Sequence, residues 1–450
     1  MLGLAKEKRI RLIPTQVLVL GFASIIIVGA ILLALPIASS AGKSIGFLNA
    51  VFEATSAVCV TGLVVVDTGR DLSLFGQMVI ITLIQIGGLG FMTMATLVFL
   101  ILGKRITLRE RLVIQEALNE FNLQGVVRLT KSIIGITFLI EGIGAMVLAT
   151  RFIPMYGLVK GIYYSIFHAI SAFCNAGFDI MGDYKNFIEH TDDFIINFAL
   201  MSLIILGGLG FYVLLDISRN RRFRKWSLHT KLVVCVTTAL IGLGALFFLV
   251  VEFNNPGTLG NYSWKGKFLG ALFQSVTTRT AGFNTIDQAA LTDASKFMST
   301  ILMLIGASSA STGGGIKTTT VTVLLLTVFS IIRGKQDTEI FGRRIPGTVV
   351  RKALAIVTIN LTIFIMVSMI LSLIESYPLI DLLYETASAL GTVGLATFYN
   401  NALSSVSKIL IILSMFAGRV GPLTLTLALA MRLSRDKGIL KYPEEKVMVG

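Results

Sequence analysis

The chain has 450 residues, of which 54% are hydrophobic and 14% are charged, and its mean hydropathy is +0.82. Soluble globular chains contain roughly 25% charged residues, so this composition excludes an ordinary soluble domain. The net charge of +14 does not indicate nucleic acid as a partner, because the basic residues are gathered at the ends of apolar stretches. The composition predicts an all-α integral membrane protein.

Taken in chain order, the apolar blocks are long enough for helices that cross a hydrocarbon core of about 30 Å. They do not alternate polar and apolar residues, as the strands of a membrane barrel would. Eight spanning helices are predicted, at 15–35, 75–102, 133–150, 194–217, 231–251, 297–332, 350–374 and 406–431. Each pair encloses a shorter run of about 12 residues, which rises only ~18 Å and is predicted to enter the membrane halfway and return. These short helices are expected at 45–58, 161–173, 265–278 and 379–390.

The predicted fold is therefore four units of helix, short helix and helix around one central pore. The division of the chain is a cytoplasmic N-terminus at 1–14, repeat 1 at 15–102, a cytoplasmic loop and repeat 2 at 103–217, a loop and repeat 3 at 218–332, a loop and repeat 4 at 333–431, and a cytoplasmic tail at 432–450. The start of the chain mimics a secretory signal. Its apolar run from Val17 to Leu35 is longer than that of a signal peptide, and we interpret it as the first spanning helix.

Basic residues mark the predicted cytoplasmic side. Lys and Arg cluster in the segments 6–11, 104–111, 219–225, 333–344 and 432–441. All of these lie at the ends of apolar spans on one side of the predicted topology, which is the positive-inside bias. The sequence thus places both termini in the cytoplasm and the chain in the cell membrane, where the basic loops also meet anionic lipids.

One stretch occurs four times in the chain. It starts with an aromatic residue, continues with a short run rich in Ala, Ser and Thr, and ends in a turn at a Gly followed by an apolar residue. The copies are at 52–68, 167–183, 273–287 and 384–398, with their glycines at Gly62, Gly177, Gly282 and Gly394. The third copy has one residue fewer before its glycine. Such a recurrence marks an internal fourfold repeat.

A ring of these turns suits a dehydrated cation. A cation that crosses a bilayer needs oxygen ligands in place of its water, and backbone carbonyl groups supply them. Glycine reaches the backbone angles that turn successive carbonyls to one side, and a short helix that ends before the turn points its partly negative C-terminus at the ion. The predicted filter ligands are the carbonyl oxygens of Val60, Thr61, Gly62, Asn175, Ala176, Gly177, Thr280, Ala281, Gly282, Thr392, Val393 and Gly394. Any one of these glycines is more simply explained by helix packing, but four matched copies favour a filter.

Charged residues flank the turns. The acids that follow the glycines on the predicted outer side are Asp67, Asp179 and Asp287. They either concentrate cations through their field or are ordinary solvated loop acids. Arg279 lies within the third turn, where a cation is expected to point away from the filter. We expect it to pair with Glu53 or Glu385.

The last helix of the third repeat is interrupted by a polar, glycine-rich segment at 306–317. Three consecutive glycines each cost roughly 1 kcal/mol relative to Ala in a helix, and the simple interpretation is a kink or packing notch. Arg419 in the last helix of the fourth repeat is a charge at membrane depth, which is costly and indicates function. Lys317 is expected to extend toward the cytoplasm. The GGLGF runs at 87–91 and 207–211 are interpreted as packing notches, so that only the third repeat has a clearly broken helix.

These residues together resemble a known family. The motifs TSAVCVTGL, SAFCNAGF, TRTAGFN and SALGTVGL, each between two spanning helices in an M1–P–M2 repeat, resemble the Trk/Ktr/HKT superfamily. The similarity covers essentially the whole chain and is greatest to the membrane subunit of Ktr-type potassium uptake systems. It implies a homodimer with one pore per subunit that passes K⁺ and some Na⁺. In this superfamily a Ser at the first filter glycine tends to accompany a preference for Na⁺, so Gly62 at this position favours K⁺.

The same resemblance implies a gate and a partner. Segment 306–317 would be an intramembrane gating loop below the filter, held closed together with Arg419. The predicted gating residues are Gly306, Ser308, Ser309, Ser311, Thr312, Gly313, Gly314, Gly315, Lys317 and Arg419. A cytosolic ring of nucleotide-binding, RCK-type regulatory subunits would dock on the basic loops at 103–131, 218–230 and 333–351.

No cofactor is predicted to bind this chain. Neither GxxxxGK[ST] nor a strand-led GxGxxG occurs, the three Cys and three His have no metal-ligand spacing, and no polar cluster marks a membrane enzyme. We therefore favour a channel-like potassium uptake subunit. The alternative is a Na⁺-coupled or Na⁺-preferring transporter of the same fold, although inverted repeats with matched breaks are not seen in the sequence.

Overall fold

The computed structural model describes residues 14–90 and 126–421, together with the single positions 93, 94, 96, 424 and 445. Several predictions fall outside the described residues. These concern the N-terminal segment before residue 14, most of the loop at 103–131, the inner ends of the spans 75–102 and 406–431, and nearly all of the tail at 432–450.

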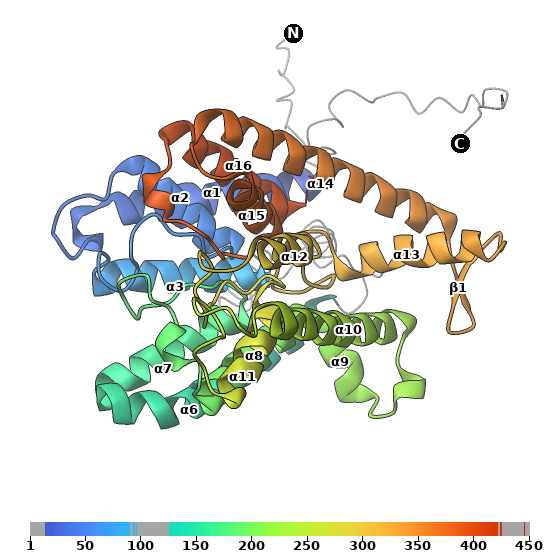
Figure 1. The fold of residues 1–450 in the computed structure, drawn as a ribbon, viewed down its shortest axis with the longest axis horizontal. Helices are drawn as coiled ribbons and strands as arrows, with labels where there is room; N and C mark the ends of the chain where they lie inside the picture. The colour runs from blue at the N-terminus through green and yellow to red at the C-terminus, as the bar shows by residue number, and fades with distance from the viewer. Residues whose placement is uncertain are drawn as a thin grey trace, which may run out of the picture.

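The described chain is mostly helical, and its helices follow one order four times (Figure 1). The first in each unit is long: α1 (Pro14–Ala34), α6 (Val126–Tyr156), α10 (Leu228–Val251) and α14 (Gly347–Ile374). The second ends at a glycine turn: α2 (Phe47–Cys59), α7 (Leu158–Phe173), α11 (Trp264–Thr277) and α15 (Leu379–Gly391). The third follows the turn: α3 (Leu74–Leu89), α8 (Phe194–Leu209) with α9 (Phe211–Arg219), α12 (Asp293–Leu304) with α13 (Thr318–Ile332), and α16 (Ser405–Val420). Short 3₁₀ helices lie at η1 (Pro36–Ala38), η2 (Ile188–His190), η3 (Phe223–Lys225) and η4 (Asn400–Ala402).

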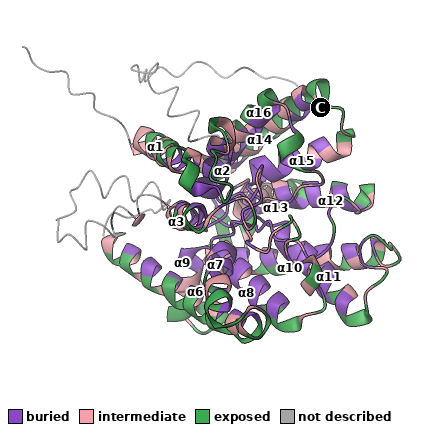
Figure 2. Ribbon diagram, turned by 90° about the vertical axis from the view of Figure 1, so that its left-hand side faces the viewer, coloured by how far each residue is buried: buried purple, intermediate pink, exposed green. Residues whose placement is uncertain are grey.

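The four long helices carry the membrane signal. Each is long and apolar enough to cross a membrane alone, and only 22–33% of its most apolar window is buried inside the chain. Figure 2 shows buried residues concentrated at the centre of the molecule and exposed residues along the outer helices. Helices this apolar, with so much surface outward, fit a hydrocarbon environment. The described chain is a helical membrane protein.

The helices that follow the turns begin at matched side-chain caps. In each, an oxygen of the N-cap residue accepts a hydrogen bond from a first-turn N–H group, which otherwise has no intrahelical partner. The caps are Ser73 on α3, Asp193 on α8, Thr292 on α12 and Ser404 on α16. The matched caps therefore set the residue at which each helix after a turn begins.

Two acids tie these caps to the preceding long helices. Glu252 follows α10 and accepts a hydrogen bond from the Thr292 N–H group at 3.1 Å. Glu375 follows α14 and accepts one from the Ser404 N–H group at 3.0 Å. The third and fourth units therefore close in the same way on the side away from the basic loops.

Glycines end or bend the helices after the turns at matched places. α3 ends before Gly90, α8 meets α9 at Gly210 with a bend of 96°, and α16 ends before Gly421. Their φ angles are 80°, 95° and 90°, in the region that residues with a Cβ avoid. The prediction that only the third repeat has a clearly broken helix is therefore wrong. A glycine three residues after the packing glycine was the missed signal in the sequence.

The first glycines of the GGLGF runs pack against helix ends. A Cβ on Gly87 would overlap the carbonyl oxygen of Val58, and one on Gly207 would overlap that of Phe173. The interpretation of these runs as packing notches is confirmed at these two positions.

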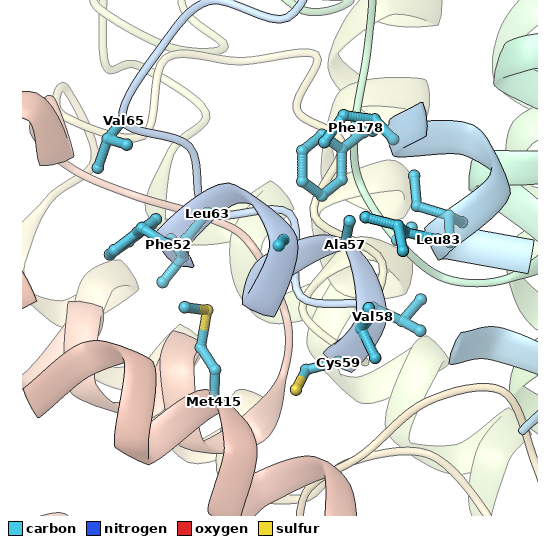
Figure 3. Close-up of a cluster of buried hydrophobic side chains, with 14 of the residues drawn as sticks. Phe52, Ala57, Val58, Cys59, Leu63, Val65, Leu83, Phe178 and Met415 are labelled. Carbon is cyan, nitrogen blue, oxygen red and sulfur yellow. The ribbon is translucent and has the colours of Figure 1, made fainter. Parts of the chain in front are cut away.

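The helices that end at the turns form the buried centre. In α2 every residue from Phe52 to Cys59 is buried. Figure 3 shows side chains from α2 packed with others from the first turn, α3, the second turn and α16, namely Phe52, Ala57, Val58, Cys59, Leu63, Val65, Leu83, Phe178 and Met415. The first turn is thus held by elements of three repeats.

A small hairpin was not predicted. Strands β1 (Thr338–Ile340) and β2 (Arg343–Ile345) pair antiparallel between α13 and α14 (Figure 1). The two turn residues, Phe341 and Gly342, both have positive φ, as a tight two-residue hairpin turn requires. The hairpin lies within the basic segment 333–351.

Candidate functional site

The four glycine turns meet in one ring. A Cβ added to any of these glycines would lie under 3.0 Å from the carbonyl oxygen of the residue before the next glycine in chain order. The pairs are Gly62 with Ala176, Gly177 with Ala281, Gly282 with Val393, and Gly394 with Thr61. The last pair closes the ring between the fourth repeat and the first. Only residues without a side chain fit at these positions.

The backbone of each turn alternates in handedness. Positive φ occurs at the first residue of each triplet, with 57° at Val60, 59° at Asn175, 71° at Thr280 and 52° at Thr392. It recurs two positions later, with 90° at Gly62, 69° at Gly177, 83° at Gly282 and 96° at Gly394, whereas the middle residues have no positive φ. Such alternation turns successive peptide groups toward one side, where a regular strand would alternate them. Left-handed angles at non-glycine residues are unfavourable and persist only where the surroundings enforce them.

Hydroxyl groups accept hydrogen bonds from the first and fourth ring glycines. Ser56 Oγ accepts from the Gly62 N–H group at 3.0 Å. Ser388 Oγ accepts from the Gly394 N–H group, also at 3.0 Å. Both serines lie in the helix before the turn, six residues ahead of the glycine, so the helix directly fixes the orientation of the ring peptide.

In the second and third turns the hydroxyl donates. Ser171 Oγ donates to the carbonyl oxygen of Phe178 at 2.7 Å, and Thr277 Oγ1 donates to that of Phe283. The sequence reasoning registered these residues only as part of a run rich in Ser and Thr. Ser171 lies six residues before its glycine, as Ser56 and Ser388 do, and this offset was a signal available in the sequence, whereas Thr277 lies five residues before its glycine.

A cavity of about 360 Å³ lies against the ring, and all four ring glycines are in its wall. The rest of its lining comes from residues after the glycines, on the predicted outer side. Asp67, Asp179 and Asp287 all line it. Their carboxylates also accept backbone hydrogen bonds, for example from Gly69, Met181 and Ala289. The acids therefore both face the cavity and order its loops.

Arg279 does not pair with either glutamate named from the sequence. Within the described chain, its Nη2 group is hydrogen-bonded to the hydroxyls of Thr237 on α10 and Thr318 on α13, each at 3.4 Å. The expectation of pairing with Glu53 or Glu385 is wrong. The reason is that α10 and α13 pack behind the third turn and offer hydroxyls closer than either carboxylate.

The interruption between α12 and α13 runs under the ring. Gly314 N–H donates to Thr392 Oγ1 at 2.9 Å, and a Cβ on Gly313 would overlap Thr280 Oγ1. Thr280 and Thr392 begin their triplets, whereas the cavity adjoins the glycines that end them. The segment thus contacts the end of the ring opposite the cavity. Thr312 Oγ1 also donates to the Phe173 carbonyl at 3.2 Å.

Other residues of the segment bind the α8–α9 bend and one another. Ser308 N–H donates to the Gly208 carbonyl at 3.0 Å, and the Phe211 N–H group donates to the Ala310 carbonyl at 2.9 Å. Within the segment and its junction with α13, the hydroxyls of Ser309 and Ser311 bond to Thr319 Oγ1 and the Ser308 carbonyl, and Thr318 Oγ1 bonds to the Gly306 carbonyl. The bend in the second repeat therefore supports the break in the third.

Lys317 folds back onto the segment. Its Nζ donates to the carbonyl oxygens of Gly313 at 2.7 Å and Gly314 at 3.4 Å. The expectation that it extends toward the cytoplasm is wrong, because these two carbonyls replace the water that its ammonium group would otherwise need.

Arg419 on α16 joins three elements. Its guanidinium donates to the carbonyl oxygens of Thr312 in the segment and of Gly87 on α3, and to that of Gly88 at 3.3 Å. The planar guanidinium offers several fixed donors, so one partly buried side chain can bridge the fourth repeat, the first repeat and the interruption.

The arrangement offers backbone oxygens and no cluster of metal ligands. Across residues 14–90 and 126–421, no group of three or more His, Cys, Asp or Glu side chains is placed to hold a metal ion. A closed ring of backbone groups between an acid-lined cavity and a polar segment, inside a helical membrane protein, defines a transport protein for cations.

Comparison with known proteins specifies the family. The chain belongs to the TrkH family, described as cation transport protein, whose model matches residues 15–440. The resemblance to the Trk/Ktr/HKT superfamily is thereby confirmed. The chain is 44% identical to Ktr system potassium uptake protein B of Bacillus subtilis, with 98% of each chain covered. It is 41% identical to potassium/sodium uptake protein NtpJ of Enterococcus hirae, with 99% of each covered.

The fold matches a solved structure of the same family. The crystal structure of the potassium transporter TrkH from Vibrio parahaemolyticus superposes with a TM-score of 0.71 at 18% sequence identity, covering 96% of this chain and 87% of that one. At this identity the match establishes the fold of the chain.

Proposed function

We propose that this chain is the ion-conducting membrane subunit of a potassium uptake system and that the glycine ring is its selectivity filter. The observation that carries the proposal is the closed ring of four triplets with alternating backbone handedness. Carbonyl oxygens held in this way replace the hydration shell of K⁺. The two full-length relatives are named for potassium or potassium/sodium uptake. Influx is driven by the membrane potential, which supplies about 2.3 kcal/mol per charge per 100 mV.

In this proposal the four units are M1–P–M2 repeats. The long helices and the helices after the turns make eight transmembrane segments, and the helices that end at the turns are re-entrant pore helices. The apolar surface of the long helices supports this assignment. Both termini lie in the cytoplasm of a cell-membrane protein in this proposal, which the positive-inside bias of the basic segments supports.

Residues 306–317 and Arg419 form the gate in this proposal. Arg419 and the Ser and Thr groups of the segment hold it across the inner end of the ring, so K⁺ passes only when it moves. The support is that Thr312 is bonded both to Arg419 and to the helix end at Phe173. Three glycines at 313–315 give the segment the freedom to change conformation.

The functional assembly is proposed as a homodimer with a cytosolic, nucleotide-binding ring of RCK type. The name of the Bacillus relative as a Ktr system protein implies a further subunit. The basic segments 218–230 and 333–351, which include the β1–β2 hairpin, offer docking surfaces for it. They also meet anionic lipid headgroups.

The test is expression in a bacterial strain that lacks its own K⁺ uptake, with and without a Ktr-type regulatory subunit. Growth at limiting K⁺ and uptake of radioactive Rb⁺ are measured. Rescue at low K⁺ supports the proposal. A chain that reaches the membrane in normal amounts and supports neither growth nor Rb⁺ uptake with the regulatory subunit present would disprove it.

A Na⁺-preferring or Na⁺-coupled transporter is the second candidate, favoured by the name of the Enterococcus relative. Purified protein in liposomes distinguishes the two. If Na⁺ gradients drive K⁺ accumulation without a membrane potential, the second candidate is correct. If K⁺ follows only the electrical gradient, the first is.

A further inference from the structure

One position recurs in all four helices that end at the ring. It is the residue after the aromatic residue that begins each copy of the repeat, and it is polar and buried in every case. The four residues are Glu53, His168, Gln274 and Glu385. A buried polar group needs hydrogen-bond partners, so their partners indicate what the position does.

In the first two repeats the side chain holds the segment that leaves the ring. Glu53 Oε1 accepts hydrogen bonds from the N–H groups of Val65 at 2.7 Å and Val66 at 3.1 Å. His168 Nε2 accepts from the Ile180 N–H group at 3.3 Å. Val65 and Ile180 both lie three residues after their ring glycine.

The third repeat reaches the same segment through a second amide. Gln274 and Gln288 exchange two amide hydrogen bonds, of 2.8 and 3.0 Å. Gln288 Nε2 in turn donates to the Ile286 carbonyl at 2.8 Å. In three repeats, then, a polar side chain on the helix before the turn holds the segment after the turn by hydrogen bonds, directly or through a second side chain.

The fourth repeat breaks this pattern. Glu385 is fully buried, yet among the described residues no group lies within full hydrogen-bond distance of its carboxylate oxygens. The same holds for Asn400 Oδ1 and Thr397 Oγ1, in side chains that are 3% and 9% exposed. The Asn400 side chain is the group that approaches the Glu385 carboxyl group as a hydrogen-bond donor. Thr397 lies three residues after its ring glycine, in the register of Val65 in the first repeat.

Basic side chains on the adjoining helices are occupied elsewhere. Lys296 on α12 is paired with Asp381 at 2.8 Å, and Lys408 on α16 donates to Asn49 Oδ1 at 3.3 Å. A buried carboxylate that has no counter-charge and only one amide donor in reach is strongly unfavourable. A cation that reaches this point would relieve that cost. Thr397 and Asn400 also line the cavity against the ring, which provides the route.

We propose that Glu385, Asn400 and Thr397 form a binding site for a monovalent cation, Na⁺, separate from the ring and behind its fourth turn. Carboxylate, amide and hydroxyl oxygens are the ligands of hard cations. One carboxylate balances one positive charge, which selects a monovalent over a divalent ion at a buried site. This inference goes beyond the proposed transport function and does not depend on it.

The test is the thermal stability of the purified full-length chain in detergent. K⁺ is kept saturating so that the ring is occupied, and Na⁺ replaces choline at constant ionic strength. A ligand that binds only the folded state raises Tm with its concentration. Wild type is expected to show a saturable rise in Tm with Na⁺, and Glu385→Gln, which keeps the shape and removes the charge, is expected to lose it.

Glu53→Gln is the matched control. It makes the same change at the same position of the first repeat, where two backbone donors already serve one carboxylate oxygen, Oε1. It is expected to keep the full response to Na⁺. Thr397→Val and Asn400→Ala keep the carboxylate, remove one ligand each, and are expected to weaken the apparent Na⁺ affinity about tenfold. If Glu385→Gln does not fold, the Na⁺ responses of Thr397→Val and Asn400→Ala test the site instead.

Two results would overturn the inference. If wild type shows no rise with Na⁺ over choline, the carboxyl group is simply protonated. If Glu385→Gln responds as wild type does, Na⁺ binds elsewhere. A Glu385-dependent rise in a protein that supports no K⁺ uptake would leave this site standing while disproving the proposed function.

Discussion

The ring and the interruption beneath it touch at Thr280 and Thr392, but they are built differently. The ring uses the same backbone conformation four times, with close contacts from each glycine to the next. The interruption occurs once, between α12 and α13, and is anchored by hydrogen bonds to α8, α16 and the helix end at Phe173. The conformation of the ring is enforced by four equivalent sets of contacts, whereas each hydrogen bond of the interruption occurs only once.

This difference separates two tasks in the proposed function. A site that distinguishes ions by coordination needs fixed oxygens, and fourfold packing supplies rigidity. A gate needs two states that are close in free energy, and a segment held by a few hydrogen bonds can move when one of them is lost. The structural asymmetry of the third repeat therefore matches a functional asymmetry, which the following changes test.

The largest effect is expected from a side chain in the ring. Gly62→Val places a Cβ against the Ala176 carbonyl at a φ of 90°, and we expect loss of K⁺ uptake with the protein still in the membrane. Gly46→Val is the control, because Gly46 has a similar φ of 87° and no atom within 4 Å of an added Cβ. Rb⁺ uptake is measured for both. Equal uptake by the two variants would remove the ring from the pathway.

The second effect is expected in the opposite direction. Arg419→Ala removes the bonds to the interruption and to α3. Hydrogen bonds to charged groups contribute about 1.5–3 kcal/mol, so we expect cation flux to rise about tenfold. Lys408→Ala, on the same helix with one bond to Asn49, is the control and should leave flux unchanged. A fall in flux for Arg419→Ala at normal expression would contradict the gate.

A third change should alter stability without altering flux. Glu252 is buried, which by itself raises its pKa, but hydrogen bonds from Ser295, Thr258, Thr292 and Asn255 outweigh burial and hold the pKa of Glu252 below its ordinary value of 4.5. Because the folded pKa is the lower one, this stabilisation is present above about pH 4.5 and is lost as the pH falls through the folded pKa. Glu252→Gln should lower the free energy of unfolding by about 1–3 kcal/mol at neutral pH.

Tm measured from pH 7 to about pH 3 checks this expectation, because the loss is expected below about pH 4.5. Wild type should lose stability toward acid more steeply than Glu252→Gln. Glu375→Gln changes the matching acid of the fourth repeat, which is more exposed, and should show a smaller difference. Parallel pH profiles for wild type and Glu252→Gln would show that the network is not charged in the folded protein.

The smallest effects should be shared equally around the ring. Ser56→Ala and Ser388→Ala each remove one hydrogen bond to a ring N–H group, worth about 1 kcal/mol. We expect similar, few-fold losses of discrimination between K⁺ and Na⁺, measured by competition in Rb⁺ uptake. If one serine changes selectivity far more than the other, the ring does not act as a fourfold unit.

The sequence identified the elements that depend on local pattern. Apolar length predicted α1, α10 and α14 to within a few residues of their observed ends, and the recurrence of Gly62, Gly177, Gly282 and Gly394 singled out the turns that meet in the ring. It missed the bend at Gly210, because a glycine in an apolar run is compatible with both a packed helix and a broken one. The spacing of three residues between two glycines becomes informative only when the first, second and fourth repeats are compared, at 87/90, 207/210 and 418/421.

The hydrogen-bond partners of the buried charged side chains could not be predicted from the sequence. Arg279 was expected beside a glutamate and is bonded to Thr237 and Thr318, and Lys317 was expected to leave the segment that it instead binds. Hydrophobicity and glycine freedom are properties of a short stretch of chain, so the amino-acid sequence by itself determined a helical membrane protein with four matched turns. Only the tertiary structure decided which carbonyl, hydroxyl or carboxylate each buried charge meets, because those groups come from distant segments and their distance is set by packing.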